Sequence, residues 1–252
     1  MAVALKASSG AGFMQWANLV FSRLNTRYEQ ATAEDIISWA IENFGTGLTV
    51  GTSFGASGLV LMDLAIKIQP DIDIFYIDTN YFFPESYKLI ERIQDHYQRN
   101  LRRVLPEQTI AQQTEEYGPA LYQRDPDLCC QLRKVAPLQT ALQDSTAWVT
   151  AIRRDQASTR ISTPAISWSE RHNVVKVAPL IHWREDEIWQ YVRNHNLPYN
   201  QLHDQGYPSI GCAPCTRPVQ PGEDMRSGRW QGKSKIECGL HVDGVSTSVT
   251  VA

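Results

Sequence analysis

The sequence predicts an α/β protein built on a mostly parallel, twisted sheet with helices on both faces. Through residues 48–195, short apolar segments of strand length alternate with longer segments of helical periodicity. Strands that alternate with helices are typical of a parallel sheet covered on both faces. Beyond Leu197 the alternation ends and Gly, Pro, Arg and Cys become frequent, which predicts a C-terminal active-site loop and a mobile tail.

The first strand–turn–helix unit has clear boundaries. A capping-box pattern at residues 32–35 opens a helix that runs to about Asn43, and Gly45 lies just past its end. Residues 48–52 then predict a buried strand, and the apolar residues 59–68 predict the next helix. The turn between them is rich in small residues.

The middle of the chain continues the alternation. Residues 71–78 alternate apolar and polar positions, which predicts a second strand. Pro84 begins a helix to about Tyr97. Residues 101–105 predict a short third strand, and residues 128–142 predict a further helix.

Two strands and a helix complete the predicted alternation before residue 197. Residues 148–152 and 174–178 predict two more strands, and residues 183–195 predict a helix. We expect residues 1–30 to be a lead segment and residues 31–252 to form one domain, within which residues 225–252 are a mobile catalytic tail.

Composition and charge exclude several classes of partner. The formal net charge of −3 provides no bulk basic field for nucleic acid. No run of about 18 apolar residues is present, so we expect no membrane span. The first 12 residues lack the long apolar stretch of an export signal, so we expect a cytoplasmic protein, where structural disulfides are rare. A homo-oligomer is compatible with the chain.

The five cysteines fall into three groups. Cys129 and Cys130 are adjacent, Cys212 and Cys215 form a Cys-x-x-Cys pair, and Cys238 stands alone near the C-terminus. An odd number of cysteines in this setting favours a metal centre plus a reactive thiol. An adjacent pair is awkward for one tetrahedral zinc and easier on a cubane, whose iron corners each take one thiolate. Spacing alone leaves zinc open.

Two segments at predicted strand ends are candidates for nucleotide binding. The loop of residues 53–58 contains Ser53 and Gly55 and opens a helix, where backbone N–H groups attract phosphate. It is not a Walker A motif, because no Gly-Lys-Ser/Thr follows. Asp78 and Thr79 end the second strand, where polar side chains can bond to a sugar or a base.

Positive charge recurs beside these motifs although the chain is acidic overall, which predicts a small polyanionic ligand. The cations include Lys134, Arg160, Arg226 and Arg229. Basic residues also precede Cys238, and a histidine three residues later would add positive charge; a cationic setting of this kind favours a nucleophilic role for the thiol.

Several ordered segments together resemble the thioredoxin-dependent sulfonucleotide reductases, the assimilatory adenylyl-sulfate and phosphoadenylyl-sulfate reductases. The resemblance covers roughly residues 49–241. The segments that carry it are residues 78–85, 129–135, 153–160, 203–217 and 237–241. It implies an adenine nucleotide α-hydrolase-like fold. The loop of residues 53–58 lacks the Asp of the related pyrophosphatase-type loop, and Ala151 stands where Gly is common.

The four paired cysteines imply the branch of the family that carries a [4Fe–4S] cluster, and this branch resembles adenylyl-sulfate reductase. By the same resemblance Cys129, Cys130, Cys212 and Cys215 are the cluster ligands. The resemblance places Lys134 between the cluster and the substrate sulfate.

The resemblance also assigns the reacting groups. It makes Cys238 the nucleophile and places Arg226, Arg229 and His241 at the phosphosulfate. The implied reaction converts adenylyl sulfate to sulfite and AMP through a Cys S-sulfo intermediate that thioredoxin or glutaredoxin resolves, as a step of sulfate assimilation and cysteine biosynthesis.

Three alternatives stay open at this point. The same chemistry can act on phosphoadenylyl sulfate, or on both substrates. An ATP-cleaving adenylyltransferase would have a similar loop, although the missing Asp argues against it. A zinc-stabilised nucleotide-binding module without redox activity would need neither a cluster nor Cys238.

Overall fold

In the computed structural model, residues 11–233 and 235–241 are described. Their sheet has six strands in the order β3-β2-β1-β4-β6-β5, and every pair is parallel except β5–β6. The strands are β1 (Leu48–Thr52), β2 (Asp73–Ile77), β3 (Arg102–Val104), β4 (Ala147–Thr150), β5 (Ile166–Ser169) and β6 (Val174–Val177). The predicted fold class is confirmed.

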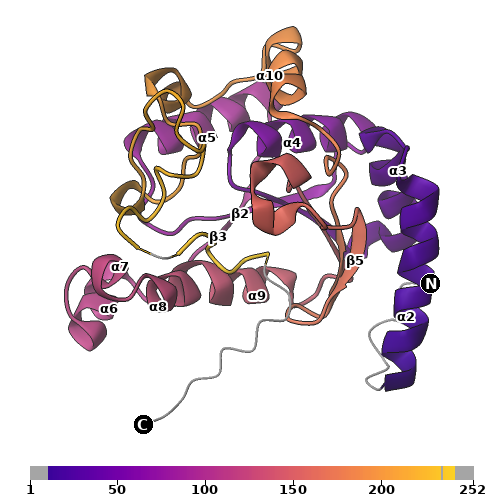
Figure 1. Cartoon of the computed structure of the whole chain (residues 1–252), viewed down its shortest axis with the longest axis horizontal. Coiled ribbons are helices and arrows are strands. Elements are labelled where there is room, and N and C mark those ends of the chain that lie inside the picture. The colour runs from indigo at the N-terminus through magenta and orange to yellow at the C-terminus, as the bar shows by residue number, and fades with distance from the viewer. Residues whose placement is uncertain (1–10, 234, 242–252) are drawn as a thin grey trace.

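Helices cover both faces of the sheet, as Figure 1 shows. On one side lie α3 (Ala33–Phe44), α4 (Ala56–Ile68) and α5 (Pro84–Tyr97), with α10 (Glu185–Asn194) packed on α4. On the other side α9 (Ala136–Leu142) packs on β2 and β3, and α6 (Ile110–Tyr117), α7 (Leu121–Arg124) and α8 (Pro126–Cys130) extend from it. No helix of the described residues is long and apolar enough to cross a membrane.

The strands alternate their side chains between two apolar clusters. In β2, Ile74 and Tyr76 join the larger cluster with α3, α4 and α5, whereas Phe75 joins a smaller one with Leu138 of α9. This period of two is the expected geometry of a strand buried on both faces. The sheet is therefore the central layer of a three-layer structure.

The helix starts follow their sequence signals. The Thr32 hydroxyl accepts a hydrogen bond from the backbone N–H of Asp35 at 3.1 Å, and the Asp35 carboxylate accepts one from the N–H of Thr32 at 3.1 Å. The predicted capping box is therefore confirmed. Pro84 is the first residue of α5, where its missing N–H costs no helical bond.

The helix predicted over residues 128–142 is wrong in one respect. It is interrupted by a π-helical turn, Gln131–Val135, between α8 and α9. A π turn inserts an extra residue into the helical ladder and often marks a functional site. Here Arg133 is buried while the next residue, Lys134, lies at a cavity.

Four described elements are absent from the sequence-based interpretation. The short helices α6 and α7, the edge strand β5 and the N-terminal helix α2 (Ala11–Tyr28) were not expected. Strand β5 is antiparallel because only four residues join it to β6, too few for a parallel crossover.

Helix α2 is attached to the sheet through the edge strand. The Asn25 amide donates to the carbonyl of Ile166 at 2.7 Å and accepts from its N–H at 2.9 Å. One side chain therefore completes the hydrogen bonds of a residue on the outer strand. Phe21 and Tyr28 of the same helix are buried in the larger apolar cluster.

Asn25→Ala should lower the free energy of unfolding by about 1–3 kcal/mol, because two backbone groups of Ile166 lose their partner. Denaturant unfolding followed by circular dichroism measures the change. Asn43→Ala is the matched control, since the Asn43 amide bonds only within its own helix, to Trp39 O at 2.8 Å. Equal stability of the two variants would contradict the assigned role of Asn25.

Candidate active site

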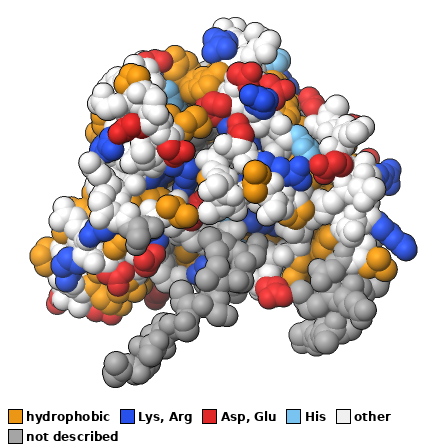
Figure 2. Space-filling model, viewed as in Figure 1, with side chains coloured by type: hydrophobic (Ala, Val, Ile, Leu, Met, Phe, Trp, Pro, Cys, Tyr) orange, Lys and Arg blue, Asp and Glu red, His pale blue; other side chains and the backbone are white. Residues whose placement is uncertain are grey.

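A cavity of about 260 Å³ lies at the carboxyl ends of β1, β2 and β4. Residues 51–58, at the end of β1 and in the loop after it, and residues 150–153, at the end of β4 and after it, form two of its walls. In open α/β sheets this edge is where ligands bind. Figure 2 shows Lys and Arg side chains gathered toward the middle of the face seen in Figure 1.

The loop after β1 presents backbone N–H groups to the cavity. Phe54 takes a left-handed conformation with φ of 59°, and its N–H donates to the Thr52 hydroxyl at 3.2 Å. Gly55 is the N-cap of α4 and no side chain caps that helix, so its first N–H groups are available to an anion. The predicted residues Ser53 and Gly55 both line the cavity.

Glycine at position 58 allows α4 to pack closely on β1. A Cβ atom there would lie 2.8 Å from the Thr52 hydroxyl oxygen, so a larger residue would push the first turn of the helix away. Ala151, which stands where Gly is common by the resemblance, also lines the cavity.

Asp78 is the predicted binding residue that the structure does not bring to the cavity. Its carboxylate is fully buried and accepts hydrogen bonds from Arg103 at 2.9 Å, from Tyr87 at 2.9 Å and from the N–H of Asn80 at 2.8 Å. Burial and Asp78 together raise the pKa of Tyr87 to about 12. Asp78 therefore holds the strand-end turn, while its neighbour Thr79 lines the cavity.

The buried guanidinium of Arg133 fixes the same turn from the other side. Its Nε donates to the Thr79 carbonyl at 2.6 Å and its Nη2 donates to the Asn80 side chain at 2.8 Å. Its Nη1 donates to Gln113 at 3.0 Å and to the Gln108 carbonyl at 3.2 Å. The strand-end turn is thereby held against the segment that carries the adjacent cysteines.

The four paired cysteines come together, as their spacing predicted. Cys129, Cys130, Cys212 and Cys215 line one small cavity beside the larger one. Burial, reinforced by the neighbouring thiols, raises the pKa of Cys129 to about 12 and that of Cys215 to about 11. The Thr79 hydroxyl lies 3.3 Å from the Cys212 sulfur.

The arrangement of the four thiols limits which metal centre they can hold. Within the described ranges, no three His, Cys, Asp or Glu side chains are grouped to hold a single ion. Thiolates on separate corners of a cubane need not converge on one point. Four thiols around one shared cavity therefore fit a cluster, and they fit a single tetrahedral zinc less well.

Lys134 lines both cavities. Burial alone lowers the pKa of its ammonium, but Cys212, Cys238 and Cys130 outweigh burial and raise it. Lys134 thus joins the cysteine cavity to the larger one, in the position where the sequence analysis expects a cation between metal centre and substrate.

The C-terminal segment lies in the larger cavity. Cys238 and His241 line it together with Arg160, Arg226 and Arg229, so these predicted residues meet in one place. Arg229 also donates to Ser209 at 3.3 Å. Of the predicted cavity residues, only Asp78 lies elsewhere.

Glu237 is a site residue that the sequence analysis missed. Arg160 holds it with two bonds, Nε to Oε1 at 3.0 Å and Nη2 to Oε2 at 2.9 Å, and Arg226 donates to Oε2 at 3.1 Å. Its position directly before Cys238 was the available signal. The carboxylate pairs with two of the cations expected to meet an anionic ligand.

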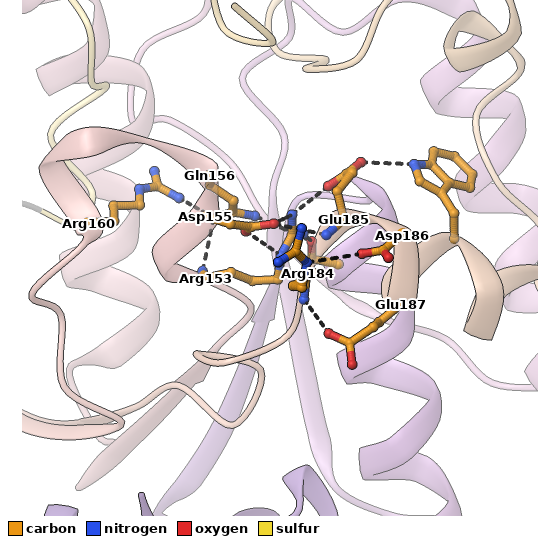
Figure 3. Close-up of polar contacts among 10 residues, drawn as sticks. Arg153, Asp155, Gln156, Arg160, Arg184, Glu185, Asp186 and Glu187 are labelled. Atoms are coloured by element: carbon orange, nitrogen blue, oxygen red, sulfur yellow. Dashed lines mark hydrogen bonds and ion pairs between the residues drawn. The ribbon is translucent and has the colours of Figure 1, made fainter.

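Arg153 begins the segment of residues 153–160 that carries the resemblance, and its buried guanidinium anchors the loop after β4 (Figure 3). It donates to Asp155 at 2.9 Å and to Glu185 at 2.5 Å. Gln156 accepts from the Arg153 N–H at 3.1 Å and also from Arg160. This network fixes the direction of Arg160 toward the cavity.

His241 stacks on Trp148, with ring centroids 5.1 Å apart and planes 11° from parallel. Burial first, then the positive charges of Lys176 and Arg160, hold the pKa of its imidazole well below its usual value. The ring is therefore neutral near pH 7, which corrects the expectation that His241 supplies positive charge to the site.

Comparisons with known proteins found similar sequences. The family described as phosphoadenosine phosphosulfate reductase domain matches residues 47–218. The "Adenosine 5'-phosphosulfate reductase" of Halalkalibacterium halodurans is 47% identical over 221 residues, which cover 87% of this chain and 96% of that protein. The "Adenosine 5'-phosphosulfate reductase 1" of Bacillus subtilis is 47% identical over 210 residues, covering 83% and 90%.

Solved structures show the same architecture. The phosphoadenylyl-sulfate reductase of Candida auris, in a phosphate complex, has a TM-score of 0.71 and 28% identity, covering 83% of this chain and 98% of that one. The FMN adenylyltransferase of Candida glabrata, with FAD and pyrophosphate, has a TM-score of 0.53 and 18% identity over 86% of this chain and 71% of its own. That second likeness shows a shared fold alone.

The imidazole of His241 should stay neutral as the pH falls through 6.5. A docked ring with a lowered pKa binds a proton less readily than the undocked ring, whose pKa is about 6.5. Docking of this segment therefore weakens as the pH falls below that value. Histidine-ring NMR measures the titration, and the resonance lost in His241→Asn assigns the signal. Protonation at or above pH 6.5 would refute the neutral ring.

Proposed function

The chain belongs to the phosphoadenosine phosphosulfate reductase family, and from that membership we propose that it reduces adenylyl sulfate to sulfite and AMP. One observation carries the proposal: Cys238 lies in the strand-edge cavity beside Lys134, Arg226 and Arg229, while four further cysteines gather next to it. Relatives at 47% identity bear the name of adenosine 5'-phosphosulfate reductase.

The nucleotide would bind along the wall formed by residues 51–58. The N–H groups at the start of α4 suit its phosphate, and Thr79 at the end of β2 suits its sugar or base. Asp78 would contribute indirectly, by holding the turn that presents Thr79. The phosphosulfate would then extend toward Lys134 and Cys238.

The covalent step would use Cys238 as its nucleophile. Its thiolate attacks the sulfate sulfur, an S–S bond forms, the bond from that sulfur to the bridging oxygen breaks, and AMP leaves with the electron pair. The product on the enzyme is a Cys238 S-sulfo group. Both reactants are anionic, so the step needs neighbouring positive charge.

Lys134, Arg226 and Arg229 would supply that charge. Arg226 is paired with Glu237 in the structure, and burial lowers the pKa of its guanidinium, although the group stays charged. His241, with its lowered pKa, would act as a neutral hydrogen-bonding partner of the phosphosulfate. The lysine and the two arginines would therefore neutralise charge, and the imidazole would only form hydrogen bonds.

The second half of the reaction would need an external dithiol such as thioredoxin or glutaredoxin. One thiolate of the dithiol attacks the Cys238 sulfur, sulfite leaves, and a mixed disulfide forms. The second thiol then releases Cys238 and leaves the reductant oxidised by two electrons. The tail after residue 225 would have to move for its adduct to be reached.

The four paired cysteines would hold a [4Fe–4S] cluster, which supplies a charged metal centre beside Lys134 when bound. The shared cavity supports this ligand set. The dithiol already supplies the two electrons that the reaction needs. We therefore propose that the metal centre acts on the site electrostatically, through Lys134, and does not transfer electrons to the substrate.

The closest rival function is reduction of the 3′-phosphorylated nucleotide. It is favoured by the likeness to the phosphoadenylyl-sulfate reductase of Candida auris. Against it stand the four grouped cysteines, which by resemblance mark the adenylyl-sulfate branch, and the higher identity to relatives of that name.

Turnover of the two nucleotides decides between them. With a thioredoxin-like dithiol as reductant, we expect kcat/KM for adenylyl sulfate to exceed that for phosphoadenylyl sulfate by at least about tenfold, or 1.4 kcal/mol of transition-state binding. Sulfite release is the measurement. A preference for the phosphorylated substrate would select the rival, and no sulfite from either would sink the proposed function.

Cys238→Ser should abolish sulfite release, by at least about a thousandfold as for other lost nucleophiles, while the four paired cysteines keep their metal centre. Mass spectrometry of the unmodified chain with adenylyl sulfate should show an S-sulfo group that the variant lacks. Ile236→Ala, at an exposed neighbouring position, is the control and should keep both. An adduct that persists in Cys238→Ser would place the nucleophile elsewhere.

A further inference from the structure

Side chains hold the segment that follows Cys238 by contacting its backbone carbonyl groups. Arg171 Nη1 donates to the carbonyl of Gly239 at 3.1 Å. His172 Nε2 lies 3.4 Å from the carbonyl of Leu240, and Lys176 Nζ donates to that of His241 at 3.2 Å. Three successive carbonyls are thus each met by a side chain from one hairpin, β5–β6.

We propose that Arg171, His172 and Lys176 form a carbonyl clasp, which positions the tail so that Cys238 stays in the cavity during attack. This inference rests on the proposed function. The three side chains are positioning residues, because they contact the backbone carbonyls of the tail rather than the reacting atoms. The sequence pattern of the β5–β6 hairpin does not predict this role.

The clasp matters because a second attachment of the tail, at Glu237, uses cations that the substrate would also need. Glu237 is held by Arg160 and Arg226, the cations that an anionic nucleotide would engage. Substrate binding would therefore weaken the Glu237 contacts at the moment when Cys238 must be in place. Hydrogen bonds to backbone carbonyls do not use those cations, so the clasp persists when substrate enters.

Local geometry fits a defined docked state. Gly239 has φ of +87°, a left-handed conformation that side chains disfavour, and an added Cβ would lie 3.5 Å from a Val135 methyl carbon. Leu240 packs against the smaller apolar cluster. The chain therefore turns at Gly239 and directs its next two carbonyls toward the hairpin.

The clasp is also tied to the cysteine segment. Arg171 Nη2 donates to Gln131 at 2.9 Å, and Gln131 directly follows the adjacent cysteine pair. One guanidinium therefore contacts both the tail and the π-helical turn that carries Lys134. Arg171 fixes the nucleophile and this turn relative to each other.

Alkylation of Cys238 by iodoacetamide in the full-length, metal-loaded protein tests the clasp without turnover. Mass spectrometry of the Cys238 peptide gives the rate. We expect Arg171→Ala and Lys176→Met each to raise the rate about tenfold, as for loss of a charge-assisted hydrogen bond, and Arg171→Lys to restore most of the protection. Arg193→Ala, an exposed residue of α10, is the control.

Arg171 is exposed, so its loss should leave the fold intact even if Lys176→Met unfolds. The same Arg171→Ala variant should lower kcat for adenylyl sulfate with KM nearly unchanged. An unchanged alkylation rate in Arg171→Ala would overturn the clasp. Failure of the unmodified protein to release sulfite would overturn the proposed function instead, and the alkylation result would still stand.

Discussion

The arrangement of the site depends on the buried guanidinium of Arg133. A buried charge is costly unless its donors are satisfied, and this one is satisfied only when the turn after β2, including Thr79 and Asn80, and the segment at Gln108 and Gln113 are all in place. The π-helical turn buries residue 133 and leaves residue 134 at the cavities. One local irregularity therefore sets where the cysteine pair and the cation beside it lie relative to the sheet edge.

The two cavities form one site because they share residues. Lys134 lines both, and the thiols on either side of it raise its pKa, so its charge is favoured where two anionic groups would approach it. Thr79 likewise lines the larger cavity while its hydroxyl contacts Cys212. Glu237 pairs with the cations that a substrate anion would need, which links tail position to substrate entry.

The sequence predicted those features that have a local pattern, such as the apolar periodicity of strands and the spacing of cysteines. Apolar periodicity predicted five of the strands, and cysteine spacing predicted the four-thiol cavity. Helix α2 is held by contacts distant in sequence, such as Asn25 to Ile166, whereas edge strand β5 pairs with β6 across only four residues and was still not expected. Asp78 looked like a ligand because it ends a strand, but its partner Arg103 lies on the next strand. The partners of Glu237 and the carbonyl contacts of Arg171 are likewise tertiary, so the local sequence does not identify them.

We propose that the four paired cysteines hold a cluster beside a nucleotide site, and elemental analysis tests this most directly. Protein purified without oxygen should contain about four iron atoms and four acid-labile sulfides per chain and be brown, as expected for one [4Fe–4S] centre. One zinc per chain and a colourless protein would contradict the presence of a cluster and would indicate that the four cysteines bind a structural zinc.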